Sequence, residues 1–219
     1  MMILTDIFLA ALVVLNLALA GVGRLPGAIH LVAAQGVLIG LLPVVLTGEH
    51  WLVAVVNMLV KGVVMPVMLT FAMRKANTVR ELEPLVGFGK SVAAVFVCTL
   101  LSFRFTPGPL AIAISFATIA TGLFLIVSRR KAITQVIGFL VFENGISAFA
   151  AGISMDYGLV IELGILLDVF VLVFILGIAI YEINRTFSSV DIDKLNHLGD
   201  ARHLHHHHPH VNRVPGGEK

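Results

Sequence analysis

Seven long apolar stretches constrain what this chain can fold into more than any other feature of its sequence. A membrane-spanning helix needs about 20 mainly apolar residues to cross roughly 30 Å of hydrocarbon. Only helices satisfy all their backbone hydrogen bonds within one such segment. The sequence therefore predicts an all-α, polytopic membrane bundle of about seven transmembrane helices, at residues 4–23, 27–46, 51–73, 90–106, 109–127, 132–153 and 157–182.

The composition agrees with a membrane protein and narrows the function. The chain is 58% hydrophobic and 13% charged, whereas soluble domains have about 25% charged residues. The single cysteine, Cys98, falls within a predicted span, so we expect no disulfide framework and no thiolate cluster for a metal. Any redox cofactor must then belong to another chain. The net charge of +2 gives no reason to expect a nucleic-acid partner.

Basic residues lie in or beside the odd-numbered connections between the predicted spans, and the even-numbered connections hold only Arg104. The positive-inside rule then predicts an N-terminus outside and a cytoplasmic C-terminus. Although Ala18-Leu19-Ala20 resembles a cleavage site, the stretch before it carries Asp6 and no basic residue, so we expect a retained helix. The basic residues are Arg24, Arg74, Lys75, Arg80, Lys90, Arg129, Arg130 and Lys131.

Polarity divides the chain into four parts. Residues 1–73 hold the first three spans, 74–90 form a charged cytoplasmic linker, and 91–182 hold the last four spans. Residues 183–219 form a hydrophilic cytoplasmic tail with seven of the nine histidines. A His run can bind Zn or Ni, but this one lacks the fixed spacing of a site, so we predict a solvated end and no metal site.

Four polar residues lie near the centres of four different spans: Gln35, Lys61, Glu143 and Asp168. A charged side chain at a helix centre costs about 2.5–3.5 kcal/mol on insertion scales, and these positions are too deep to reach the headgroups. We therefore expect all four side chains to face protein or internal water at one depth of the membrane.

The residues around Lys61 and Glu143 add polar groups to this depth. Asn144 follows Glu143 directly and Ser147 lies one turn on, while Asn57 lies one turn before Lys61. Pro66 removes one helical hydrogen bond just after Lys61, which predicts a local kink and a free backbone acceptor.

Two interpretations of these residues remain open. A buried Lys–carboxylate pair can simply lock helices together, whereas four polar groups at one depth favour a lateral proton relay. For the relay we select Glu143, Asp168 and Lys61 as proton-carrying residues, with no catalytic residue. The supporting residues are Gln35, Asn57, Asn144, His30 and Glu162.

The run from Arg129 to Asp193 resembles the three-helix K-type subunit of bacterial complex I and the C-type subunit of multi-subunit cation/proton antiporters. The shared features are a double Arg, an Ile-Gly seven residues later, a polar helix centre and a closing Ile-Asp. The whole chain is most similar to the hydrogenase-4 and formate hydrogenlyase membrane component E family. The features shared there include the "ENG" of the sixth span, the Asp of the seventh and the Lys followed by Pro of the third.

The alignment with the K-type subunit departs at one point. Leu140 takes the place of that family's first buried carboxylate, and Glu143 follows three residues later on the same helix face. Asp168 matches the second family carboxylate only to within about one turn.

The resemblance implies a non-catalytic subunit, with a K-type C-terminal unit, of a complex I-like group 4 [NiFe]-hydrogenase. It would contribute buried charged residues to proton or Na⁺ translocation driven by electron transfer. The implied partners are antiporter-like membrane subunits, an H-type membrane anchor and hydrophilic hydrogenase subunits that hold the NiFe centre and iron–sulfur clusters; no cofactor is expected in this chain. The alternatives are a subunit of a cation/proton antiporter and a structural membrane scaffold.

Overall fold

The computed structural model describes residues 2–47, 51–75, 85–106, 108–153, 164, 168–177 and 181. The chain divides into two compact units, Met1–Ile180 and Tyr181–Lys219, and the helices described below belong to the first. The His-rich tail and most of the predicted linker at 74–90 lie outside the described residues.

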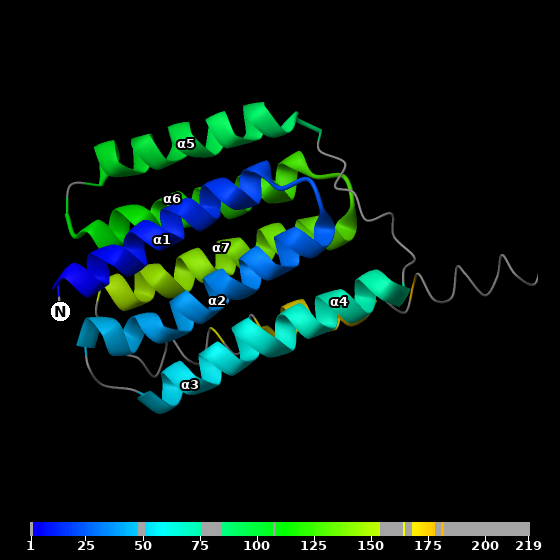
Figure 1. Cartoon of the computed structure of the whole chain (residues 1–219), viewed down its shortest axis with the longest axis horizontal. Helices are drawn as coiled ribbons and strands as arrows, with labels where there is room; N and C mark the ends of the chain where they lie inside the picture. Colours follow the sequence, from blue (N-terminus) through cyan, green and yellow to red (C-terminus); the bar gives the residue numbers. More distant parts are fainter. Residues whose placement is uncertain are drawn as a thin grey trace, which may run out of the picture. The chain divides into compact units, whose positions relative to one another are not determined.

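The described part of the chain is helical along the predicted apolar stretches (Figure 1). Five of its helices are long and apolar enough to cross a membrane, and two shorter apolar helices, Thr5–Gly21 and Asp168–Gly177, match the first and last predicted spans. The predicted all-α membrane bundle is thereby confirmed. The elements are α1 (Met2–Gly21), α2 (Leu25–Thr47), α3 (Trp51–Leu59), the π-helical turn η1 (Val60–Val64), α4 (Met65–Lys75), α5 (Phe88–Phe105), α6 (Leu110–Ser128) and α7 (Ala132–Gly152).

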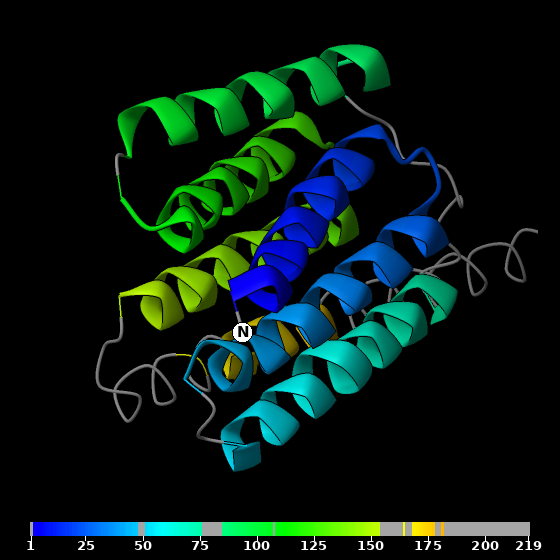
Figure 2. The same cartoon turned by 60° about the vertical axis from the view of Figure 1, so that its left-hand side comes forward.

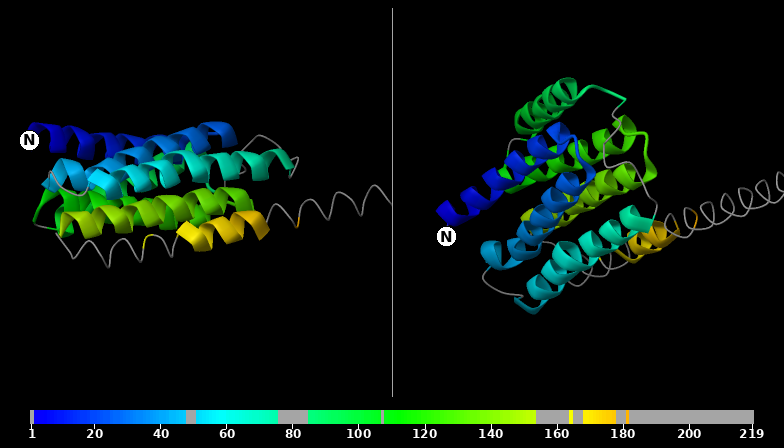
Figure 3. Two further views of the ribbon diagram at one scale, coloured as in Figure 1. Left: turned by 90° about the horizontal axis from the view of Figure 1, so that it is seen from below. Right: turned by 45° about the vertical axis from the view of Figure 1, so that its right-hand side comes forward.

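The centre of the bundle is formed by α2 and α7. Helix α2 packs against α1, α3, η1, α4 and α7, and helix α7 also packs against α6. Figure 2 shows α5 at one edge of the bundle and the α3–α4 helix at the opposite edge. The 168–177 helix runs beside α7 (Figure 3), where Val171 and Ile175 join the buried core formed with Ile133 and Val136.

Small residues allow α6 and α7 to approach closely. A Cβ atom added at Gly145 would lie 2.6 Å from the backbone nitrogen of Ile119, and one at Gly138 would lie 2.7 Å from that of Ile126. Membrane helices associate mainly through such close packing, because lipid tails are as apolar as the helices themselves. The contact fixes α7, which carries Glu143, against its neighbour.

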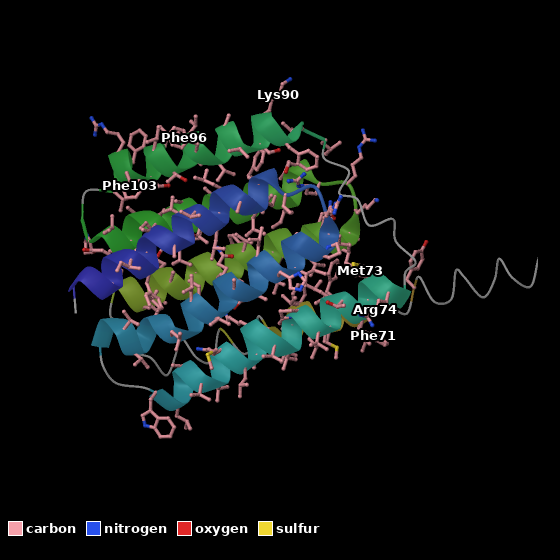
Figure 4. The ribbon with its side chains drawn as sticks, in the orientation of Figure 1. Phe71, Met73, Arg74, Lys90, Phe96 and Phe103 are labelled. Carbon is pink, nitrogen blue, oxygen red and sulfur yellow. The ribbon has the colours of Figure 1, made fainter. Side chains whose placement is uncertain are left out.

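The outer helices present apolar side chains to the surroundings of the bundle. Figure 4 labels Phe96 and Phe103 on α5 and Phe71 on α4, and these rings are 51%, 40% and 45% exposed. Such faces are suited to contact with lipid hydrocarbon. Of the polar residues at mid-span, Gln35 and Glu143 lie on α2 and α7, and Asp168 lies on the 168–177 helix. Lys61 lies on the α3–α4 helix itself, but it is buried.

Candidate functional site

A π-helical turn carries Lys61 into the interior. The backbone N–H of Met65 donates to the carbonyl oxygen of Val60, five residues earlier, which is the hydrogen bond of a π-helix. Pro66, which follows at once, has no N–H to continue the regular α-helical ladder. The sequence predicts a local kink next to Pro66, and the structure has a π-helical turn there. Lys61, the second residue of this turn, is only 6% exposed.

Lys61 forms an ion pair with Glu143 of α7 inside the bundle. Its Nζ donates a hydrogen bond to Glu143 Oε1 and a second one, 3.0 Å long, to Ser147 Oγ one turn further along α7. The exposed fractions of the two side chains in the ion pair are 5% and 1%. In such a place a charge must be paired or neutralised, because its own hydration has been removed. The pair joins the third predicted span to the sixth.

Asp168 brings a second carboxyl group to the same cluster from the 168–177 helix. It is 7% exposed, it interacts electrostatically with both Glu143 and Lys61, and its side chain is within hydrogen-bonding reach of Glu143. The three residues selected from the sequence as proton-carrying thus lie together. We call Lys61, Glu143 and Asp168 the ionisable cluster.

Gly36 of α2 allows the backbone of η1 to come close to the centre of the bundle. A Cβ atom at this position would lie 2.8 Å from the carbonyl oxygen of Lys61 and 2.9 Å from its Cβ. One turn on, a Cβ at Gly40 would lie 2.8 Å from the backbone nitrogen of Met58. Close helix packing explains both glycines, and it places Lys61 at the depth of Gln35.

A chain of side-chain amides runs away from the ionisable cluster across four helices. Asn144 Nδ2 donates to Gln35 Oε1 at 3.3 Å, Gln35 Nε2 donates to Asn16 Oδ1 at 2.8 Å, and Asn16 Nδ2 donates to Thr118 Oγ1 at 2.9 Å. All four side chains are buried, at 3% exposure or less. We call Asn144, Gln35, Asn16 and Thr118 the amide chain. It begins at the residue directly after Glu143 and links α7, α2, α1 and α6.

Sequence reasoning named Gln35 and Asn144 but missed Asn16 and Thr118. Asn16 carried a usable signal, since it is an amide well inside the first apolar stretch. Thr118 carried none, because a helical threonine usually donates to its own helix, as Thr118 Oγ1 does to the carbonyl of Ile114 at 2.9 Å.

The other supporting residues lie outside the cluster or outside the described part. Asn57 is half-buried on α3, one turn before Lys61. His30 is exposed near the start of α2, five residues before buried Gln35, so the structure does not bring it to the ionisable cluster. Glu162 lies outside the described residues.

Arg129 marks the end of the bundle where α6 meets α7. Its Nη2 donates to the carbonyl oxygen of Ala20 at 3.1 Å, and its guanidinium lies 5.5 Å from the ring centroid of Phe88. Burial lowers the pKa of Arg129 from its ordinary value, because the charged form loses hydration. The contacts tie α1 and the start of α5 to this connection, 14 residues before Glu143 in the chain.

The ionisable cluster places two carboxyl groups beside one ammonium group in the interior of the bundle. Among the described residues there is no group of three or more His, Cys, Asp or Glu side chains placed to hold a metal ion.

Comparisons with known proteins give one relative along most of the chain and a second along part of it. The chain is similar to "Uncharacterized protein Rv0085" of Mycobacterium tuberculosis, with 30% identity over 213 residues that cover 90% of this chain and 97% of the relative. It is also similar to hydrogenase-4 component E of Escherichia coli K12, with 26% identity over 149 residues that cover 63% of this chain and 68% of the relative. No family model and no solved structure matches the chain.

Proposed function

This chain belongs to the same protein family as the uncharacterized protein Rv0085 of Mycobacterium tuberculosis, and from its further similarity to hydrogenase-4 component E we propose that it is a non-catalytic membrane subunit of a complex I-like group 4 [NiFe]-hydrogenase. In this role it helps to couple electron transfer in partner subunits to proton movement across a prokaryotic plasma membrane. The hydrophilic partners hold the NiFe centre and the iron–sulfur clusters. The N-terminus lies outside and the C-terminal tail in the cytoplasm.

The observation that carries this proposal is the ionisable cluster. Lys61, Glu143 and Asp168 come from three helical segments that are far apart in the chain, yet they lie together in the interior. Ionisable residues inside membrane bundles are costly and mark ion or proton paths. Glu143 is the proposed proton-relay residue, with the Asp168 carboxyl group and the Lys61 ammonium group as its charged neighbours.

A structural scaffold is the second candidate, and a specific observation favours it. The Lys61–Glu143 ion pair and the amide chain both join separate helices. Polar contacts with a purely structural role, which only fix how the helices pack, would do the same. The scaffold predicts that loss of the Glu143 charge affects assembly alone. The relay predicts an effect on coupling in an assembled complex.

The test is the proton-pumping ratio, measured as protons moved per electron transferred, in membranes that carry Glu143→Gln. Native gels of the same membranes report whether the complex is assembled. The relay predicts an assembled complex with reduced pumping or turnover, and an assembled complex with both intact contradicts it. Thr121→Val is the matched control, since Thr121 is buried and its hydroxyl donates only to the Ala117 carbonyl of its own helix in the described contacts.

A further inference from the structure

Two buried carboxylate oxygens in the ionisable cluster have no hydrogen-bond donor in the described part of the chain. They are Glu143 Oε2 and Asp168 Oδ1. Buried polar atoms are nearly always hydrogen-bonded, so each exception calls for a specific explanation. Here both exceptions belong to carboxyl groups that lie within hydrogen-bonding reach of each other.

The donors of Lys61 do not resolve these exceptions. Its ammonium group donates to Glu143 Oε1 and to Ser147 Oγ, which leaves the second oxygen of Glu143 unpaired. An ionised carboxylate only accepts hydrogen bonds, whereas a protonated one has an O–H to donate. Two ionised carboxylates therefore cannot satisfy one another, but a protonated and an ionised one can.

The charge of the cluster leads to the same requirement. The charged groups that act on Asp168 are Glu143 of α7 and Lys61 of η1. With every group ionised, one positive charge faces two negative charges, so one carboxylate is uncompensated in the interior. Carboxylates held this close together do not both stay ionised without a further positive charge.

We propose that Glu143 and Asp168 bind one proton between them, at Glu143 Oε2 and Asp168 Oδ1. The proton forms an O–H bond with one carboxyl group and a hydrogen bond with the other, so both unpaired oxygens gain a partner and the cluster becomes neutral with Lys61 ionised. The inference rests on the proposed function, in that it makes a proton the ion exchanged at the relay. It also means that the Glu143–Asp168 pair holds one proton when the complex is at rest.

The number of available ligands favours a proton over a sodium ion. Hard cations are held by several oxygen ligands at once. Among the described residues of the cluster, two fully buried side-chain oxygens lack a partner, Glu143 Oε2 and Asp168 Oδ1, while Ser147 Oγ and Glu143 Oε1 are already engaged by Lys61. A proton needs only two oxygens, one as a covalent partner and one as an acceptor.

Infrared spectroscopy of the purified full-length chain in lipid nanodiscs tests the proposal. The wild-type chain should show the C=O stretching band of a protonated carboxyl group at neutral pH, and the band should shift in D₂O. Glu143→Gln and Asp168→Asn should each abolish it, because the remaining carboxylate then pairs with Lys61 and stays ionised. Lys61→Met should roughly double its intensity, because neither carboxyl group then has a positive partner.

The controls separate this inference from the proposed function. Asp6→Asn, which removes an exposed carboxyl group on α1, should leave the band unchanged. Absence of the band from a wild-type chain with normal helix content overturns the proposal. So does a band that survives in Glu143→Gln, since the proton would then belong to Asp168 alone, and so does a carboxylate spectrum that responds to NaCl and not to KCl. A proton-pumping ratio unaffected by Glu143→Gln would contradict the relay and leave the shared proton standing.

Discussion

Asn16 of α1 donates its side-chain amide to Thr118 of α6 at 2.9 Å, across 102 residues of sequence. The two residues are fully buried. The same Asn16 accepts from Gln35 at 2.8 Å, so α1 is held to both α2 and α6 by one side chain. The first helix is therefore part of the same polar framework as α7, which carries Glu143.

Asn16→Leu should lower the free energy of unfolding by about 1–2 kcal/mol, because it leaves the Gln35 amide without its acceptor in a dry interior. Unfolding of the purified chain in mixed micelles measures this change. Ser115→Ala is the control, since Ser115 is also buried but donates to the Ala111 carbonyl of its own helix. An equal loss in the two variants would show that the interhelical bonds of Asn16 contribute nothing specific.

Lys61→Met should destabilise the bundle strongly, by about 3–5 kcal/mol, because breaking a buried ion pair leaves its partner without compensation. Adding Glu143→Gln should recover part of that loss, since the variant chain then has one carboxyl group fewer to neutralise. A double-mutant cycle of the same unfolding measurement gives the coupling between the two residues. Additive losses would mean that the ion pair does not couple the helices. Lys90→Met, at an exposed position on α5, should change the unfolding free energy little.

Gly36→Ala should destabilise the chain by about 1–3 kcal/mol, the usual range for overpacking. The added methyl group would lie 2.8 Å from the carbonyl oxygen of Lys61, which is backbone and cannot rotate away. Gly89→Ala on α5 should have the opposite sign, since no atom lies within 4 Å of the position a Cβ would take and alanine favours a helix. Thermal unfolding of the two variants in parallel checks the contrast, and destabilisation of similar size in both would refute it.

The sequence predicted the helices well because the membrane imposes a single rule on each of them. Every stretch of suitable length and hydropathy must be a helix, and the polar residue near its centre must avoid lipid. This was enough to place Gln35, Lys61, Glu143 and Asp168 at one depth. It was not enough to say which of them meet, because depth fixes a position along a helix and leaves the choice of neighbouring helices open.

Neighbours are decided by close packing, and small residues control that packing in ways that a single sequence does not reveal. Gly36 is suited to contact with many backbones, and only the fold shows that it meets Lys61. The same fold separates the four polar residues into two groups, since Gln35 bonds to Asn144 while Lys61 bonds to Glu143. From their equal depth in the membrane alone, the four residues were predicted to form one continuous group.

The π-helical turn at Val60–Val64 has a consequence for how relatives of this chain should be aligned. A π turn is an α-helix with one extra residue, so the side chains after it are rotated by roughly a quarter of a circle relative to an uninterrupted helix. A homologue that lacks the turn can therefore keep the buried positions of Met65 and Leu69 only by a gap of one residue before them. A one-residue gap at this place in an otherwise ungapped helix would identify the relatives that have lost the π-helical turn.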